Sequence, residues 1–204
     1  PKGLGSYDAK LMAEMAALAW RWYLRGDDQP FEASASAFEA MFKPLLQNHA
    51  RQCDVLIQRD YHAENLLWLP ERDGIARVGL LDFQDALAGH RAYDLVSLLQ
   101  DARRDVPPAV ETRMIDRYVQ ATGSDAEAFD AAYHLLGAQR NLRILGVFAR
   151  LSLDYGKPQY LDLIPRVWDH MIRGLDHPAL APIAEMLREA LPAPTPENLS
   201  KLRP

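Results

Sequence analysis

The fold is decided by residues 55–68, VLIQRDYHAENLLW, in which two apolar runs flank a polar loop. A second polar stretch, LLDFQDA at residues 80–86, ends another apolar run that begins at Ile75. The segment from Pro70 to Gly74 between the runs has the composition of a turn. The pattern therefore predicts a β-hairpin, with strands over 66–69 and 75–83, and a short strand at 55–57 before it.

Polar side chains gather at the strand ends of this hairpin. Because antiparallel strands pair, Asn65 at the start of one strand and Asp82 at the end of the other are expected to lie close together. Carboxylate and amide oxygens are ligands that suit Mg²⁺, together with phosphates and water. Asp60 lies near this pair but outside it, where its carboxylate is free to accept a proton.

The rest of the chain is dominated by apolar residues at helical spacing. Pro44 and Pro165 lie inside such patterns, and each is expected to bend or divide its helix because proline lacks a backbone N–H. Ser124 or Asp125 is suited to cap the longest helix. The expected fold class is α+β and mostly helical, with helices near 6–24, 38–46, 93–99, 114–122, 126–153, 161–175 and 181–191, and a loop over 26–30.

Composition and charge restrict the class of protein. The 204 residues are 49% apolar and 25% charged, as in a soluble globular chain of one or two domains. The net charge of −5 does not favour nucleic-acid binding, so small molecules are the expected partners. The single cysteine, Cys53, and the lack of zinc-ligand spacing suit a reducing compartment. No apolar run reaches the roughly 18 residues of a membrane span, so we expect a cytoplasmic protein without membrane contact.

The two polar stretches resemble the catalytic loop H-R-D-L-x-x-x-N and the metal-binding D-F-G of protein kinases. Arg59, Asp60 and Asn65 match the first motif in type and spacing. Asp82 and Phe83 match the start of the second. This resemblance implies a protein-kinase-like fold in which the hairpin carries the catalytic and metal-binding motifs.

The chain also departs from protein kinases. Gln58 replaces the His of the first motif and Gln84 replaces the Gly of the second, so the support of both loops is expected to differ. Only about ten residues separate Asp82 from the next helix, too few for a segment that docks a peptide. With Gly89 and the run at 93–95, this short link is similar to the aminoglycoside phosphotransferase and choline kinase superfamily, whose members phosphorylate hydroxyls of small molecules.

Within that superfamily, the phrases at 59–62, 66–70, 80–86 and 93–99 are similar to the bacterial anomeric amino-sugar kinases, which act on N-acetylmuramate and N-acetylglucosamine in cell-wall recycling. The resemblance covers about residues 55–107. It implies ATP and Mg²⁺ as cofactors and phosphotransfer to the anomeric hydroxyl of such a sugar.

The resemblance implies a role for each residue that matches a motif of the superfamily. Asp60 would be the catalytic base or would orient the hydroxyl, while Asn65 and Asp82 would hold Mg²⁺ on the nucleotide phosphates. Arg59 would support the loop. Asp94 matches a superfamily aspartate near the start of a helix and suits either capping that helix and bracing the catalytic loop, which we favour, or direct catalysis.

Several polar side chains nearby have two interpretations. His62 suits either a phosphate contact or a structural hydrogen bond. Glu64 and Asp85 suit either a sugar hydroxyl or a solvated, loop-bracing position. The pair at 103–104 is expected to be a solvated helix end, and Cys53 a small buried residue. Core positions are expected for Trp20, Trp22, Trp68 and Trp168.

A kinase of this type also needs a glycine-rich loop over the phosphates and a lysine that reaches them. Neither pattern is found, and the sequence opens on a helix where the superfamily crosses between its lobes. We therefore expect residues 1–191 to be a kinase-like C-terminal lobe, without its partner N-terminal lobe, and 192–204 to be an extended tail. This lobe is expected to fold alone but to be a very poor kinase.

Two other functions stay open at this point. An antibiotic phosphotransferase would bind a polycationic substrate and need several carboxylates around its pocket, so the sign of the pocket charge discriminates. A non-catalytic kinase-like module would only bind a ligand or partner. It would have no chemical need for Asp60, Asn65 and Asp82 together.

Overall fold

The computed structural model describes residues 3–24 and 31–204, so the loop expected at 26–30 lies outside the described residues. The helices are α1 (Ala9–Ala16), α2 (Phe31–His49), α3 (Tyr93–Leu99), α4 (Pro108–Thr122), α5 (Ala126–Tyr155), α6 (Ile164–Gly174), α7 (Ala181–Ala190) and α8 (Pro196–Ser200). Short helical turns are η1 (Ala19–Tyr23), η2 (Ala63–Asn65), η3 (Gly74–Arg77), η4 (Pro158–Leu163) and η5 (Pro178–Leu180). None of these described helices is both long and apolar enough to cross a membrane.

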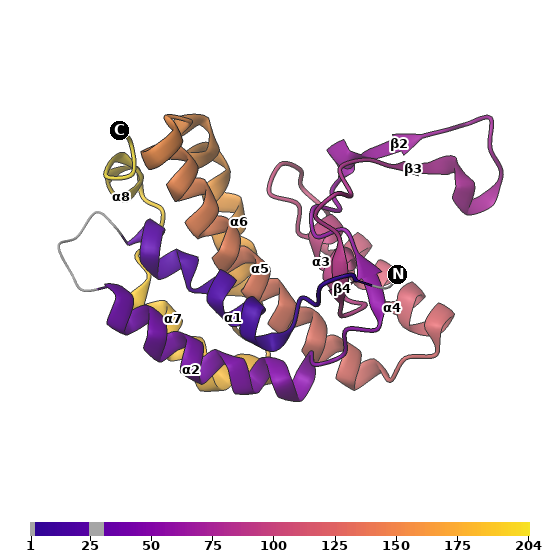
Figure 1. Ribbon diagram of the computed structural model, residues 1–204, viewed down its shortest axis with the longest axis horizontal. Coiled ribbons are helices and arrows are strands. Elements are labelled where there is room, and N and C mark those ends of the chain that lie inside the picture. Colours follow the sequence, from indigo (N-terminus) through magenta and orange to yellow (C-terminus); the bar gives the residue numbers. More distant parts are fainter. Residues whose placement is uncertain (1–2, 25–30) are drawn as a thin grey trace.

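Helix α5 is the centre of the fold. It contacts α1, α2, α3, α4 and α6, and Figure 1 shows α1 and α2 on one side of it and α6 on another. The Asp125 carboxylate accepts the Ala128 N–H at 2.8 Å and caps the start of α5, while Gly156 ends it with a φ of 61°. The cap at Asp125 agrees with the prediction. A helix buried along so much of its surface is held by packing on several sides.

The single helix expected over 6–24 is divided in the structure. Helix α1 ends at Ala16, and a π-helical turn, η1, follows over Ala19–Tyr23. The division lies where the backbone of Leu18 meets α5 at Gly146. A Cβ atom added to Gly146 would lie only 2.3 Å from the carbonyl carbon of Leu18, so this crossing requires glycine.

The two internal prolines behave differently from each other. Helix α2 is not interrupted at Pro44, contrary to one form of the expectation, because Phe38, Phe42 and Leu46 are fully buried on either side of it and fix the helix by packing. Pro165 does divide its segment. It occupies the first turn of α6, directly after η4, where its missing N–H has no helical partner to lose.

Two small antiparallel sheets hold the polar loops. Strand β2 (Leu66–Trp68) pairs with β3 (Val78–Leu80), which confirms the predicted hairpin with shorter strands. Strand β1 (Val55–Ile57) pairs instead with β4 (Leu87–Gly89). The N-terminal segment extends this second sheet, because Ser6 forms a parallel bridge with Ala88.

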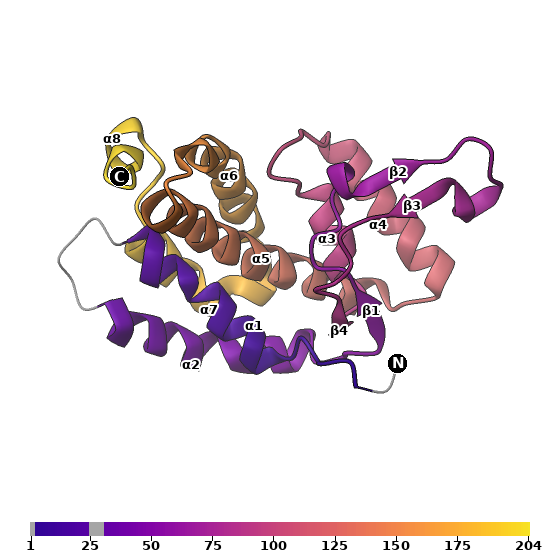
Figure 2. The same ribbon diagram turned by 45° about the horizontal axis from the view of Figure 1, so that its top comes forward.

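The β2–β3 hairpin stands apart from the helices. In Figure 1 and again in Figure 2 it projects away from the layer of α1, α2 and α5. Trp68 on β2 is 66% exposed, so the expectation that it lies in the core is wrong. The reason is that the described residues place no second layer over this hairpin.

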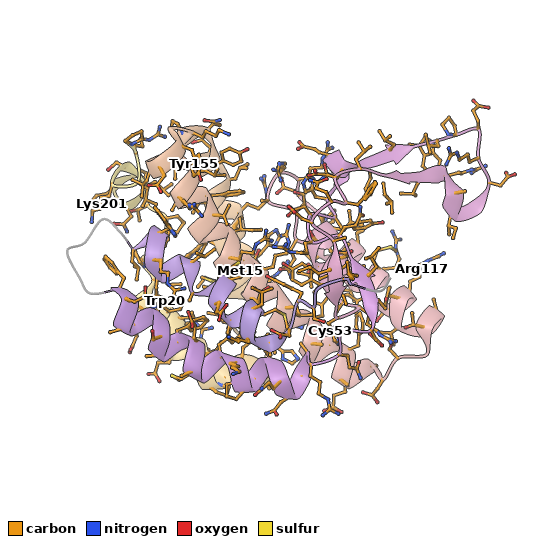
Figure 3. The ribbon with its side chains drawn as sticks, in the orientation of Figure 1. Met15, Trp20, Cys53, Arg117, Tyr155 and Lys201 are labelled. Atoms are coloured by element: carbon orange, nitrogen blue, oxygen red, sulfur yellow. The ribbon has the colours of Figure 1, made fainter. Side chains whose placement is uncertain are left out.

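The other side chains assigned to the core divide as follows. Trp20 is buried and stacks on Phe38 of α2 at 4.1 Å, and Figure 3 shows it beside the α1–α2 layer. Trp22 and Trp168 are partly buried against the same core. Cys53 is only partly buried, beside the β1–β4 sheet.

The C-terminal segment is not the extended tail that we expect from its prolines. Residues Pro196–Ser200 form α8, whose N-terminus is capped by Thr195 Oγ1 accepting the Asn198 N–H at 3.2 Å. Leu202 is buried, and the Tyr23 hydroxyl donates to the Pro192 carbonyl at 2.8 Å. The segment therefore packs on the helical core.

The contact between Gly146 and Leu18 predicts the effect of one methyl group. Gly146→Ala should lower the free energy of unfolding by about 1–3 kcal/mol, because backbone atoms must move to admit the Cβ. Gly174→Ala is the matched control, since nothing lies within 4 Å of its Cβ position and alanine favours the helix. Urea unfolding of the 204-residue chain measures both. Equal stabilities of the two variants would contradict the close approach.

Candidate functional site

The loop after β1 is held by a buried carboxylate on α3. Asp94 Oδ2 accepts the Gln58 N–H at 2.7 Å and Oδ1 accepts the Arg59 N–H at 3.0 Å. Burial raises the pKa of Asp94, and the two backbone hydrogen bonds oppose that rise. Asp94 therefore braces the loop from the first turn of its helix, but it does not cap that helix, whose N-cap residue Ala92 has no side-chain hydrogen bond.

Two residues of the polar loops have left-handed backbone. Arg59 has a φ of 71° and Asp82 a φ of 57°, and residues other than glycine rarely adopt such positive values. Such conformations cost roughly 1–3 kcal/mol and persist only where surrounding contacts impose them. At Arg59 those contacts include Asp94 and the Ser97 hydroxyl, which donates to the Arg59 carbonyl at 3.3 Å.

Asn65 connects the two polar loops. Its Nδ2 donates to the Asp60 carbonyl at 2.9 Å and lies 3.4 Å from Asp82 Oδ2. The ladder of the hairpin continues here, since the Leu81 N–H donates to the Asn65 carbonyl at 2.9 Å. The predicted proximity of Asn65 and Asp82 is therefore present in the structure.

The two glutamines that depart from the protein-kinase motifs both contact the segment that carries Asp82. Gln58 is buried, and its Nε2 donates to the Leu81 carbonyl at 3.2 Å, directly before Asp82. Gln84 Nε2 donates to Asp82 Oδ1 at 2.6 Å. Each replacement thus supplies an amide hydrogen bond to the segment that carries Asp82.

His62 is buried against this network. Its Nε2 lies 3.3 Å from Asn65 Nδ2. Its Nδ1 is buried and has no hydrogen-bond partner among the described residues. Burial lowers the pKa of His62, and the nearby Arg103 guanidinium adds to this effect, so the ring is neutral at pH 7.

A cavity of about 230 Å³ opens beside these residues. Asp60, His62 and Asp82 lie on one side, and the side chain of Asp60 is 43% exposed. Helix α5 and η4 supply an apolar wall on the other. The remaining lining residues are Ala102, Arg103, Arg140, Arg143, Ile144, Val147, Phe148, Leu151 and Tyr160.

Sequence reasoning missed the arginines of this cavity. Arg143 Nη1 lies 3.9 Å from Asp60 Oδ1, although the two residues are 83 positions apart. The available signal was the presence of Arg140 and Arg143 on a helix that is otherwise mostly apolar. Arg103 is not merely a solvated helix end, because its Nε pairs with Glu64 Oε2 at 3.1 Å and the residue lines the cavity. Its neighbour Arg104 is exposed, as expected.

Two of the predicted substrate contacts are not among the residues that line the cavity. Glu64 is exposed and reaches the cavity only through Arg103. Asp85 is exposed, and its backbone carbonyl, not its carboxylate, accepts Arg59 Nη1 at 3.5 Å. The described site therefore centres on Asp60, His62, Asn65 and Asp82.

The donor set at the hairpin fits a hard divalent cation. Asn65 uses its Nδ2 within the loops, and its Oδ1 has no hydrogen-bond partner in the described part of the chain. Asp82 adds a carboxylate that is exposed and only 3.4 Å from the Asn65 amide. One carboxylate and one amide oxygen, completed by phosphates and water, is the set that Mg²⁺ commonly takes.

A second cluster of possible metal ligands lies on α5 and the turn after α6. Asp130, His134 and His177 place one ligand atom each within 4.8 Å of one another. However, His177 Nδ1 accepts the Ala179 N–H at 3.1 Å, so the ring proton is on Nε2, which donates to Asp130 Oδ2 at 3.2 Å. A metal needs the lone pair of that nitrogen, so we interpret this cluster as a histidine–carboxylate pair.

The fold and the site together have the layout of a phosphotransferase, and the comparisons agree. The model of the phosphotransferase enzyme family matches residues 4–135, and the chain belongs to this family. An N-acetylmuramate/N-acetylglucosamine kinase of Caulobacter vibrioides is 45% identical over 93% of this chain and 53% of its own length. A protein of the same name from Pseudomonas putida is 33% identical over 91% of this chain and 56% of its own length.

A third relative, the N-acetylmuramate/N-acetylglucosamine kinase of Neisseria meningitidis serogroup B, is 33% identical over 91% of this chain and 57% of its own length. The chain thus spans about half the length of the curated relatives it matches. These matches bear out the resemblance that the motifs at 55–99 indicate.

The bracing by Asp94 predicts a selective loss of stability. In Asp94→Asn one side-chain oxygen remains for two backbone N–H groups, so one buried donor is left facing an NH₂ group. The variant should lose about 1–3 kcal/mol of unfolding free energy. Asp85→Asn is the control, because its exposed carboxylate should contribute no more than about 0.5 kcal/mol. Urea unfolding of the chain distinguishes the two, and a stable Asp94→Asn variant would be evidence against the bracing.

Proposed function

We propose that this chain is the catalytic and acceptor-binding lobe of an ATP-dependent kinase that phosphorylates the anomeric hydroxyl of N-acetylmuramate or N-acetylglucosamine. The observation that carries the proposal is the convergence of Asp60, Asn65 and Asp82 beside one cavity. The printed names of the relatives support the choice of acceptor. Members of this family transfer phosphoryl groups, so the reaction class follows from membership.

In this proposal Asp60 orients the sugar hydroxyl and accepts its proton. The Asp60 side chain is partly exposed at the cavity, while its backbone is fixed through Asn65. Asn65 and Asp82 would hold Mg²⁺, which neutralises charge on the transferred phosphate when it is bound. His62 Nδ1 has no partner in the described residues and, when it carries the ring proton, suits a phosphate oxygen. Positioning and electrostatics then supply most of the catalysis.

The charge around the cavity argues against an aminoglycoside as the acceptor. Three arginines line the cavity against two aspartates, of which Asp82 is assigned to the metal. A polycationic antibiotic would be repelled by this set, whereas a neutral or anionic sugar would not.

The backbone argues against a module that only binds. Arg59 and Asp82 both have left-handed backbone conformations, which cost conformational free energy. Strained conformations of this kind are typical of active sites. Asp60 and Asp82 also keep carboxylates at the cavity, where a binding-only site has no need of them.

The exposed hairpin suits a partner lobe of the same protein. Seven apolar side chains of β2, β3 and the adjoining turns are at least 40% exposed, a patch of the kind that marks an interaction surface. They are Leu67, Trp68, Ile75, Val78, Leu80, Leu81 and Phe83. The relatives are almost twice as long as this chain, so we assign the surface to an N-terminal lobe that brings the nucleotide. The free thiol of Cys53 and the use of ATP suit a location in the cytoplasm.

The two aspartates should fail in different ways in the complete protein. Asp60→Asn should lower kcat by about 10² or more and leave nucleotide affinity nearly unchanged, because it removes the base and not the metal ligand. Asp82→Ala should instead abolish Mg²⁺-dependent nucleotide binding. Steady-state kinetics and a magnesium titration measure the two effects. Wild-type turnover in Asp60→Asn would remove it from the mechanism.

The acceptor is tested by a panel of sugars. The complete protein with ATP and Mg²⁺ should convert N-acetylmuramate and N-acetylglucosamine to 1-phosphates, which lose their reducing end and differ from 6-phosphates by phosphorus NMR. The 204-residue chain alone should turn over hardly at all, since the described residues contain no cover for the nucleotide phosphates. Phosphorylation of kanamycin-like compounds, with none of the amino sugars, would decide for the antibiotic enzyme.

A further inference from the structure

The three arginines of the cavity differ in how many of their N–H donors remain free to bind a ligand. Arg140 is buried, and its Nη1 donates to the Gln100 carbonyl at 3.2 Å. The side chain of Arg143 is only 15% exposed and lies 3.9 Å from Asp60. Both arginines belong to α5 and are largely buried beside the proposed base. They are therefore placed to contact the reacting groups or to stabilise the fold.

Arg103 is more accessible and is held in place. Its side chain is 28% exposed, and its Nε forms an ion pair with Glu64 Oε2 at 3.1 Å. The Arg103 N–H donates to Asp101 Oδ1 at 2.9 Å, which fixes the backbone of this residue. Among the described residues, no hydrogen bond engages Arg103 Nη1 or Nη2. Two parallel donors of a guanidinium therefore remain available at the edge of the cavity.

Two parallel guanidinium donors are the geometry that a carboxylate accepts in bidentate fashion. Of the two sugars in the relatives' names, N-acetylmuramate carries a lactyl ether with a carboxylate, and N-acetylglucosamine carries a hydroxyl at the same carbon. The apolar wall of Val147, Phe148 and Tyr160 suits the methyl groups of the acetyl and lactyl substituents. The cavity therefore offers separate surfaces for the charged and the apolar parts of an acidic amino sugar.

We propose that Arg103, oriented by Glu64, binds the carboxylate of the acceptor sugar and sets the preference for the acidic sugar over the neutral one. This inference rests on the proposed function, since it assumes an amino-sugar acceptor at this cavity. Arg103 is a specificity residue and not part of the proton transfer, because Asp60 has Arg143 as its cationic neighbour.

The chain provides a matched control for this proposal. Arg104 follows Arg103 directly and is exposed, and it is not among the residues that line the cavity. Arg103→Ala and Arg104→Ala each remove one positive charge, from adjacent positions. A general change in the electrostatic potential of the protein would therefore affect the two variants alike. Arg103→Lys keeps the charge and removes the paired donors.

The test measures kcat and KM of the complete protein for both sugars in each variant, with melting temperatures as a check on folding. Arg103→Ala should lower the ratio of kcat/KM for N-acetylmuramate to that for N-acetylglucosamine by at least about tenfold, the scale of a lost hydrogen bond to a charged group. The loss should lie mainly in KM. Arg103→Lys should fall between wild type and Arg103→Ala, and Arg104→Ala should keep the wild-type ratio.

The outcomes separate the two proposals. If the wild-type protein phosphorylates both sugars and Arg103→Ala keeps their ratio, Arg103 does not bind the carboxylate, while the proposed function stands. The same conclusion follows if Arg104→Ala changes the ratio as much as Arg103→Ala. If the wild-type protein phosphorylates neither sugar, the proposed function fails, and the assignment of Arg103 fails with it.

Discussion

The site depends on one carboxylate that lies outside the cavity. Asp94 takes the backbone N–H groups of Gln58 and Arg59, and these two hydrogen bonds set the direction in which the chain leaves β1. Because Asp94 belongs to α3, and α3 packs on α5, the loop is registered against the central helix. Asp60 and Arg143 can then lie side by side although they come from distant parts of the sequence. Without that anchor the left-handed backbone at Arg59 would have little to sustain it.

A second layer of amide hydrogen bonds joins the loop of Asp60 to the loop of Asp82. Asn65, Gln58 and Gln84 each donate a side-chain N–H into this region. Amides are suited to this task because they bridge carbonyls and carboxylates without adding charge. The negative charge of the site is thereby left on Asp60 and Asp82. The two glutamines that break the protein-kinase pattern are thus part of the support of the site and not a sign of its loss.

Much of this arrangement was predictable from local sequence, since hairpins and helix caps are specified by nearby residues. The pairing of Asn65 with Asp82 follows from strand polarity, and the cap at Asp125 from its position before an apolar run. The partner of β1 was not predictable. A strand of three residues contains nothing that indicates whether it pairs with β4 or with a strand of the hairpin. The arginines of the cavity were also beyond reach, since Arg140 and Arg143 meet the loops only through the packing of α5. Trp68 was misjudged because an exposed hairpin and a buried one have the same local pattern.

The N-terminal segment is joined directly to the strand that follows Asp82. The Tyr7 N–H donates to the Ala88 carbonyl at 2.7 Å, and the Ala88 N–H donates to the Gly5 carbonyl at 2.8 Å. These bonds belong to a parallel bridge, so tension along the chain at residue 5 loads both of them in shear. The force is shared between the two hydrogen bonds and is transmitted to β4, which begins only five residues after Asp82. The N-terminal segment is in this sense a tether with a defined point of attachment, and a displacement of the chain there acts on the loop that carries Asp82 before it reaches the helices.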